Sequence, residues 1–294
     1  MDQLCGFLVL DKPAGLTSQA CVAKVRRRYG LKRVGHGGTL DPAVTGVLPI
    51  ALGPATRLLP YLPGAKTYHG LVQLGLRTST DDLSGTVLEK GAVPNLDFEQ
   101  LDSCLEHFRG PIQQRPPQVS AVHVAGERAH VRVRRGEVVE LESRAVTIHR
   151  LDLLNWDQGS QQLELVVHCS AGTYIRSLAR DLGDQLGCGG ALAQLRRTEA
   201  LGFDLAGSVS LALLEAGELP PLQDPLLALA GLPRHQLEAS DWTAWRCGRS
   251  LNTDLDLGFD QAVVVVDPDG NLAGMARSAP DGRLQPRLVF DPAG

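Results

Sequence analysis

The spacing of apolar and polar positions predicts strands and helices in alternation along most of the chain. Alternation or short apolar runs predict strands at 6–10, 68–75 and 163–169. Helical spacing predicts one helix from Thr17 or Ser18 to Gly30, one over 97–108, and one that Thr173 caps and that runs to about Leu186. Arg176 would then lie in the first turn of the third helix, at a junction between a strand and a helix.

Two further stretches have a different pattern. Residues 111–145 begin with three prolines, at 111, 116 and 117, and then become strongly basic, which predicts a projecting segment on the main domain. Residues 219–226, also with three prolines, are predicted to be a linker. Beyond it, short strands at 262–266, 272–276 and 288–290 alternate with Gly/Asp turns, which predicts a small β module.

Composition narrows the class of protein. The 294 residues are 43% hydrophobic and 21% charged, which suits one large domain or a large and a small one. The sequence contains no run of about eighteen apolar residues, so no membrane span is predicted. The start of the chain lacks the basic flank of a signal peptide. The six cysteines are scattered without a Cys-x-x-Cys pair, as expected for reduced thiols in a cytoplasmic protein.

Charge is unevenly distributed. From residue 200 onward there are 13 acidic and 6 basic residues, a net charge of −7, so the first 199 residues carry +3 of the total of −4. Two basic stretches in that first part could neutralise phosphates or could be ordinary solvated faces. The first contains Lys24, Arg26, Arg27, Arg28, Lys32 and Arg33, and the second contains Arg128, Arg132, Arg134, Arg135 and Arg144.

The loop from Gly35 to Pro42 is the strongest candidate for chemistry. It places Asp41 among glycines, which let a backbone approach a ligand closely, and before Pro42, which holds Asp41 extended. A phosphate-binding loop, a dinucleotide fingerprint, a metal-ligand spacing and a nucleophile elbow are all missing from the sequence. A single carboxylate held ionised by an arginine is the chemistry that remains. The adjacent Asp81 and Asp82 are interpreted as a polar turn.

Five separated motifs resemble the TruB family of tRNA pseudouridine synthases, over roughly residues 6–215. They are Asp11-Lys12-Pro13-x-Gly15-x-Thr17-Ser18, the segment from Gly35 to Pro49 around Asp41, Lys66-Thr67-Tyr68, Ser170-Ala171-Gly172-Thr173-Tyr174-Ile175-Arg176-Ser177, and Leu195-Arg196-Arg197. The tail, with Gly270 to Gly274 and Leu284 to Arg287, is similar to the PUA-type RNA-binding module.

The resemblance implies a fold, a reaction and a partner. The fold would be α+β, with a mixed, largely antiparallel sheet flanked by helices and a small C-terminal PUA-like β module. Its implied division is a catalytic domain at 1–226, carrying the RNA-contacting projection at 111–145, and an RNA-binding module at 227–294. The reaction would convert uridine 55 in the T-loop of tRNA to pseudouridine without a metal or other cofactor. The protein would act in the cytoplasm as a monomer, with tRNA but neither a membrane nor an obligatory protein partner.

The resemblance also assigns roles to residues. Asp41 matches the catalytic carboxylate and Arg176 the arginine that pairs with it, while Tyr68 matches the ring that packs on the target base. The remaining matches are substrate-binding positions. They are His36, beside the everted nucleotide, Tyr174 and Leu195, which line the pocket, and Lys12, near its floor.

Two departures and three alternatives accompany this hypothesis. In the projecting segment His123 stands where the family usually has Lys, and Ala129-His130 where it has Leu-Tyr, which affects RNA affinity more than catalysis. The alternatives are a tRNA-folding chaperone or other non-catalytic RNA-binding protein of the same fold, a synthase that depends on a guide RNA and partner proteins, and a hydrolase with Asp41 as nucleophile. The hydrolase would lack a second well-placed carboxylate.

Overall fold

The computed structural model describes residues 4–120, 123–124, 127–128, 132, 135, 137, 139 and 141–290. The chain folds into two compact units. The first comprises residues 1–41, 48–63 and 201–294, and the second comprises residues 42–47 and 64–200. The domain boundary predicted between residues 226 and 227 does not coincide with this division into two units, and it stays a prediction.

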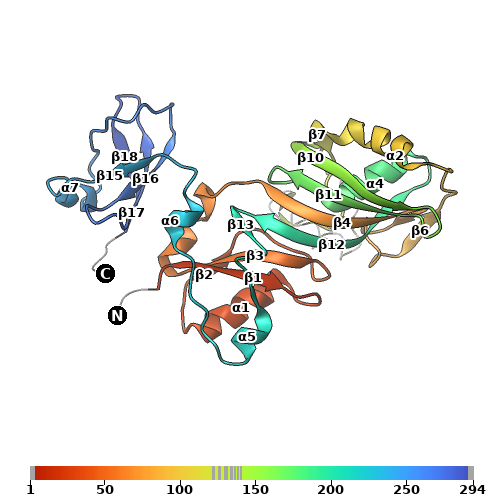
Figure 1. The fold of residues 1–294 in the computed structure, drawn as a ribbon, viewed down its shortest axis with the longest axis horizontal. Helices are drawn as coiled ribbons and strands as arrows, with labels where there is room; N and C mark the ends of the chain where they lie inside the picture. Colours follow the sequence, from red (N-terminus) through yellow and green to blue (C-terminus); the bar gives the residue numbers. More distant parts are fainter. Residues whose placement is uncertain are drawn as a thin grey trace. The chain divides into compact units, whose positions relative to one another are not determined.

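The second unit is built on five neighbouring antiparallel strands of one sheet. In spatial order they are β12 (Gly190–Ala200), β4 (Lys66–Leu74), β11 (Gln162–Cys169), β10 (Arg144–Asp157) and β7 (Gly110–Gln114). Helices α2 (Phe98–Leu105) and α4 (Ile175–Gln185) cover one face of this sheet (Figure 1). The beginning of the predicted projection, residues 111–114, thus belongs to the sheet edge.

Smaller elements complete the second unit. They are the hairpin β5 (Leu76–Thr78) and β6 (Val87–Lys90), the 3-10 turn η2 (Glu106–Phe108) and the short pair β8 (His123–Val124) and β9 (Glu127–Arg128). Asp97 caps α2 through a reciprocal capping box with Gln100, so the predicted helix over 97–108 is confirmed.

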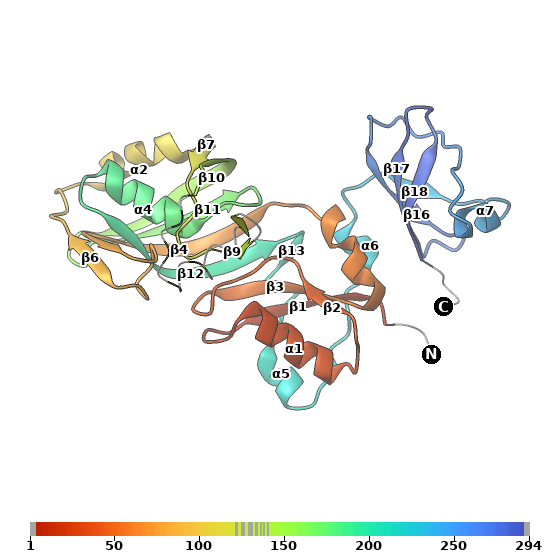
Figure 2. The same cartoon turned by 180° about the vertical axis from the view of Figure 1, so that it is seen from behind.

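The first unit begins with strand β1 (Gly6–Lys12) and helix α1 (Ser18–Arg28), whose N-cap Thr17 accepts a hydrogen bond from the Ala20 amide. Helix α1 lies beside helix α5 (Leu211–Glu215), as Figure 2 shows. Its other elements near β1 are β2 (Val34–His36), β3 (Thr45–Leu52, whose first residues belong to the second unit), η1 (Gly53–Tyr61), β13 (Phe203–Asp204), β14 (Val209–Ser210), α5 (Leu211–Glu215) and α6 (Pro225–Ala228). The predicted linker at 219–226 is tied to β1, because Phe7 and Gln223 exchange two backbone hydrogen bonds.

The predicted C-terminal β module is confirmed as a four-stranded sheet. Its elements are β15 (Arg234–Gln236), β16 (Ala262–Val266), β17 (Leu272–Ser278), β18 (Leu284–Val289) and helix α7 (Trp242–Arg246). Trp245 is fully buried in its core and donates a hydrogen bond to the Ala273 carbonyl at 3.1 Å. Because the sheets are mixed but largely antiparallel and helices flank them, the predicted α+β class is confirmed.

Some local predictions were wrong or incomplete. The N-cap of α4 is Tyr174, without a side-chain capping bond, and the helix begins at Ile175, so Thr173 does not cap it. Strand β10 was not predicted, because irregularities in its register at Ile148/Arg150 and Leu153/Asn155 break the alternation of its side chains. Strand β12 was missed because its sequence lacks alternation and buries a charged residue, Arg197.

Close packing of α4 on β12 holds the C-terminal part of this helix in place. A Cβ atom at Gly183 would lie 2.0 Å from the Gly190 amide nitrogen, so only glycine fits there. We expect Gly183→Ala to lower the free energy of unfolding by about 1–3 kcal/mol or more, because the backbone must shift. Thermal unfolding measures the effect. Gly231→Ala is the control, because a Cβ there meets nothing within 4 Å; equal midpoints for the two variants would contradict the prediction.

Candidate active site

In the first unit, the residue before Asp41 is fixed to the beginning of α1. The Leu40 amide donates to Ser18 Oγ at 2.8 Å, and Ser18 Oγ donates to the Leu40 carbonyl at 3.1 Å. Leu40 is 4% exposed, whereas Asp41 is half-buried and is the last residue of the first segment of this unit. The loop therefore presents its carboxylate from a firmly held backbone position.

Lys12 and His36 lie in the same unit. Lys12, at the end of β1, is fully buried, and its Nζ donates to the Pro13 carbonyl at 2.8 Å. Its charge also lies near the Cys21 thiol, where it opposes the rise in pKa that burial of the thiol causes. His36 ends β2 opposite Ile50 of β3 and is half-buried.

In the second unit, Tyr68 lies directly opposite Arg197 on the neighbouring strands β4 and β12. Arg197 is 0% exposed, its Nε donates to the Val47 carbonyl at 2.7 Å, and its side chain is hydrogen-bonded to Tyr68. Burial lowers the pKa of the Arg197 guanidinium, and the Tyr68 phenol opposes that shift. The ring of Tyr68 is thereby held by a buried cation.

Leu195 packs over Gly70 of β4, where the absence of a side chain leaves space. A Cβ at Gly70 would lie 3.4 Å from Leu195 Cδ1 and 3.8 Å from Ile175 Cγ2. Ile175 is the first residue of α4, and the preceding Tyr174 is half-buried, with its amide donating to Gln114 Oε1 at 2.8 Å. The structure thus brings Tyr68, Leu195 and the beginning of α4 together.

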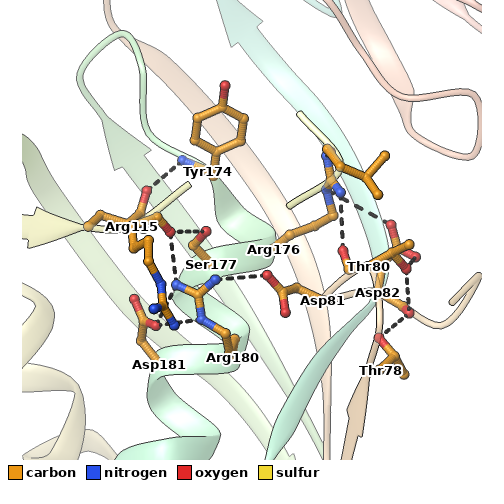
Figure 3. A network of polar contacts seen from close by, with 12 residues as sticks. Thr78, Thr80, Asp81, Asp82, Arg115, Tyr174, Arg176, Ser177, Arg180 and Asp181 are labelled. Carbon is orange, nitrogen blue, oxygen red and sulfur yellow. Dashed lines mark hydrogen bonds and ion pairs between the residues drawn. The ribbon is translucent and has the colours of Figure 1, made fainter. Parts of the chain in front are cut away.

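Arg176 is 8% exposed and is bound on several sides. Its Nη1 donates to the Thr80 carbonyl at 3.1 Å (Figure 3). Its Nη2 donates to the Val119 carbonyl at 2.9 Å. Its Nε lies 3.9 Å from Asp82 Oδ2. These contacts fix the plane of the guanidinium group.

The turn that contains Asp81 and Asp82 has more than a local role. Asp82 Oδ1 accepts hydrogen bonds from Thr80 Oγ1 at 2.7 Å and from the Ser84 amide at 3.0 Å, as in an Asx turn, while its other oxygen faces Arg176. Sequence reasoning missed this contact, because paired acids among Ser, Thr and Gly are typical of turns. It also missed Arg197, although that residue stands in a motif that was singled out.

The basic projecting segment is described only in part. Arg132 Nε and Arg135 Nε contact Glu137 at 2.7 Å and 3.2 Å. The departures at Ala129 and His130, and the cation Arg134, lie outside the described residues.

The cysteines and the helices add two general findings. All six cysteines are free thiols, and three of them, Cys21, Cys169 and Cys188, are buried. Burial raises the pKa of Cys169 to about 11. Among the helices of the described residues, none has the length and apolar character needed to cross a membrane.

Two family models place the chain among the pseudouridylate synthases, and a solved structure has the same fold. The chain superposes on the protein of a Cbf5–Nop10–Gar1 complex with a TM-score of 0.75 and 25% sequence identity, covering 98% of this chain and 85% of the other. Residues 26–175 match the TruB family pseudouridylate synthase N-terminal domain, and residues 176–219 match the tRNA pseudouridylate synthase B C-terminal domain.

Similarity to curated relatives extends over the whole chain. The chain is 64% identical to the tRNA pseudouridine synthase B of Parasynechococcus marenigrum (strain WH8102), over 100% of both proteins. It is 57% identical to the enzyme of the same name from Synechococcus sp. (strain WH7803), over 98% of both. The chain therefore belongs to the TruB family of pseudouridylate synthases, enzymes that isomerise uridine in tRNA.

Proposed function

We propose that this protein isomerises the uridine at position 55 in the T-loop of tRNA, with Asp41 as the catalytic carboxylate. The observation that carries the proposal is the full-length identity of 64% to a tRNA pseudouridine synthase B, together with the Asp41 motif at residues 35–49. The reaction breaks the N-glycosidic bond, turns the uracil within the pocket, and joins its C5 to the same sugar carbon. The C5 proton is lost and N1 gains a proton, so the atoms balance.

The proposed roles follow from what each side chain can do. Arg176, held rigid by two carbonyls, keeps Asp41 ionised and aimed without reorganising during the reaction. Tyr68, held by Arg197, packs on the uracil and assists removal of the C5 proton. The remaining proposed substrate contacts are Leu195 and Tyr174, which line the pocket, His36, beside the everted nucleotide, and Lys12, near the pocket floor.

Access to the sugar of uridine 55 requires that the base leave its stack, at a cost of a few kcal/mol. Contacts between basic side chains and phosphates offset this cost, and the folded T-loop is recognised by its shape and its splayed bases. In the C-terminal module, Arg249 and Arg283 line a hollow of about 590 Å³, which suits a contact with RNA. We propose that the enzyme acts on tRNA in the cytoplasm as a monomer, without an obligatory protein partner.

A direct experiment tests the proposed position. Purified protein is incubated with an unmodified tRNA transcript, and pseudouridine is mapped by chemical adduct formation and primer extension. The expected result is one stop at position 55, and a transcript with cytidine at that position should give none. Modification at another position, or a requirement for an added guide RNA, would contradict the proposal. Binding without any product would favour the non-catalytic alternative.

The basic end of α1 gives a second prediction. Arg26 and Arg27 are exposed in its last turn. We expect the double substitution Arg26→Gln/Arg27→Gln to weaken tRNA binding and to reduce the slope of log affinity against log salt by about two, while the rate at saturating tRNA stays unchanged. Arg277→Gln is the control, because Asp260 already neutralises Arg277 at 2.7 Å. An unchanged salt slope would exclude this helix from the RNA interface.

A further inference from the structure

A second arginine lies one turn beyond Arg176 on α4, at the i+4 position, where side chains share a helix face. Arg180 Nη1 donates to Asp81 Oδ2 at 2.8 Å, Nη2 to the Arg115 carbonyl at 2.9 Å, and Nε to Asp181 Oδ1 at 2.9 Å. Its side chain is only 13% exposed. The whole fork of this guanidinium is engaged in the fold.

The two arginines bind opposite sides of one turn. The carboxylate of Asp81 points to Arg180, and the next carboxylate, that of Asp82, points to Arg176 (Figure 3). The carbonyl of Thr80 also accepts a hydrogen bond from Arg176. A displacement of Asp81 would therefore move two of the three groups that hold Arg176.

The backbone of this turn is strained at Asp81. Its φ is 60°, in the left-handed region that residues other than glycine adopt at a cost and keep only where the surroundings impose it. Two backbone bonds fasten the turn to β12, from the Leu192 amide to the Asp81 carbonyl at 2.9 Å and from the Leu83 amide to the Leu192 carbonyl at 3.0 Å. The ion pair with Arg180 is the side-chain contact that fixes the direction in which the Asp81 carboxylate points.

The same helix face holds the root of the projecting segment. The carbonyl of Arg115 accepts hydrogen bonds from Arg180 Nη2 and from Ser177 Oγ, both at 2.9 Å. The carbonyl of Val119, four residues further on, accepts one from Arg176. Arg176 and Arg180 thus both contact the turn at residues 80–82 and the segment at residues 115–119.

Arg180 balances the negative charge of two partly buried carboxylates. Burial raises the pKa of the Asp81 and Asp181 carboxyls, and Arg180 opposes both shifts. Asp181 also feels the positive charge of Arg115, whereas the other cation that acts on Asp81 is Arg176. Without Arg180, a half-buried Asp81 carboxylate would be left uncompensated, and it would attract the guanidinium of Arg176 away from its carbonyl partners.

We infer that Arg180 is a positioning residue for uridine isomerisation, which neutralises Asp81 and so keeps Arg176 in its catalytic orientation. This inference rests on the role proposed above for Arg176. It assigns Arg180 no contact with the RNA, so its effect should fall on the rate of reaction and not on binding.

The test measures single-turnover rates at saturating enzyme, with tRNA affinity and thermal unfolding measured alongside. Arg180→Gln should lower the rate about tenfold to a hundredfold, because small misplacements of a catalytic group cost that much, with the dissociation constant changed less than about twofold. The double variant Arg180→Gln/Asp81→Asn removes the uncompensated carboxylate and should recover a rate within about threefold of the wild type. A purely structural role would make the double variant the worse of the two.

Two further variants keep the test decisive. Asp184→Asn removes another arginine–aspartate pair of α4, that with Arg77 at 2.6 Å, and should leave the rate unchanged. If Arg180→Gln does not fold, Arg180→Lys keeps the positive charge beside Asp81 and should react within about threefold of the wild type.

The outcomes separate this inference from the proposed function. A normal rate for Arg180→Gln, or a double variant that is slower than the single one, would overturn the inference. A rate loss of tenfold or more for Arg180→Lys would also overturn it, because the charge beside Asp81 is retained. Normal turnover by Arg176→Lys would refute the role proposed for Arg176 itself. An inactive Arg176→Lys with a fully active Arg180→Gln would refute the inference alone.

Discussion

Asp41→Asn should abolish pseudouridine formation while tRNA binding largely persists. The substitution keeps the size and shape of the side chain but removes its negative charge and its capacity to act as a nucleophile or base. Loss of an essential catalytic group costs about 10³-fold or more in rate. The firmly held backbone at Leu40 should keep the loop in place, so the thermal midpoint should change little. Single-turnover assays and filter binding on the same preparation measure both quantities.

The control for this variant is Asp204→Asn. Asp204 Oδ1 accepts a hydrogen bond from the Gly207 amide at 3.0 Å, which an asparagine oxygen can also accept, so full activity is expected. Mass spectrometry must exclude deamidation of the introduced asparagine back to aspartate. Complete isomerisation by an intact Asp41→Asn protein would remove Asp41 from the mechanism, whereas parallel loss of binding and of activity would indicate a role in RNA recognition.

The elements that could be predicted from the sequence are those whose signals are local. The cap at Thr17, the run of apolar residues in β1 and the helical spacing of Leu101 and Leu105 each depend on a few neighbouring residues. The C-terminal strands were found for the same reason, although β18 begins at Leu284 and not at 288. Local patterns thus predicted several of the elements, while the largely antiparallel character of the sheet came with the family resemblance.

The missed features depend on contacts that are distant in sequence. Arg197 is buried because Tyr68 and Val47 approach it from other strands, and no pattern around residue 197 announces this. Asp81 and Asp82 look like an ordinary turn until α4 brings Arg180 and Arg176 against them. Motif matching found Arg176 itself, but its partners in the second unit became evident only from the folded chain.

A common arrangement connects these features of the second unit. Two side chains with a proposed role are held by residues of other segments: Tyr68 by Arg197, and Arg176 by the carbonyls of Thr80 and Val119. Side chains fixed in this way lose little freedom when a substrate binds, which is how preorganised sites lower a barrier. Substitutions that preserve charge but alter geometry are therefore the most informative ones here.

Arg176→Lys is such a substitution, and it should lose most of the activity, about 10²-fold or more. A lysine keeps the positive charge, but its single ammonium group cannot donate to the Thr80 and Val119 carbonyls in one plane while also facing a carboxylate. Single-turnover rates at saturating enzyme measure the loss, and tRNA affinity should remain within about threefold of the wild type.

Arg77→Lys is the matched control, because Arg77 contacts Asp184 of the same helix through one nitrogen at 2.6 Å and is 46% exposed. An ammonium group can replace that contact, so this variant should react at the wild-type rate. If charge alone were required at position 176, the two lysine variants would behave alike. A fast Arg176→Lys enzyme would mean that Asp41 needs only a nearby positive charge, and that the fixed plane of the guanidinium group contributes nothing to isomerisation.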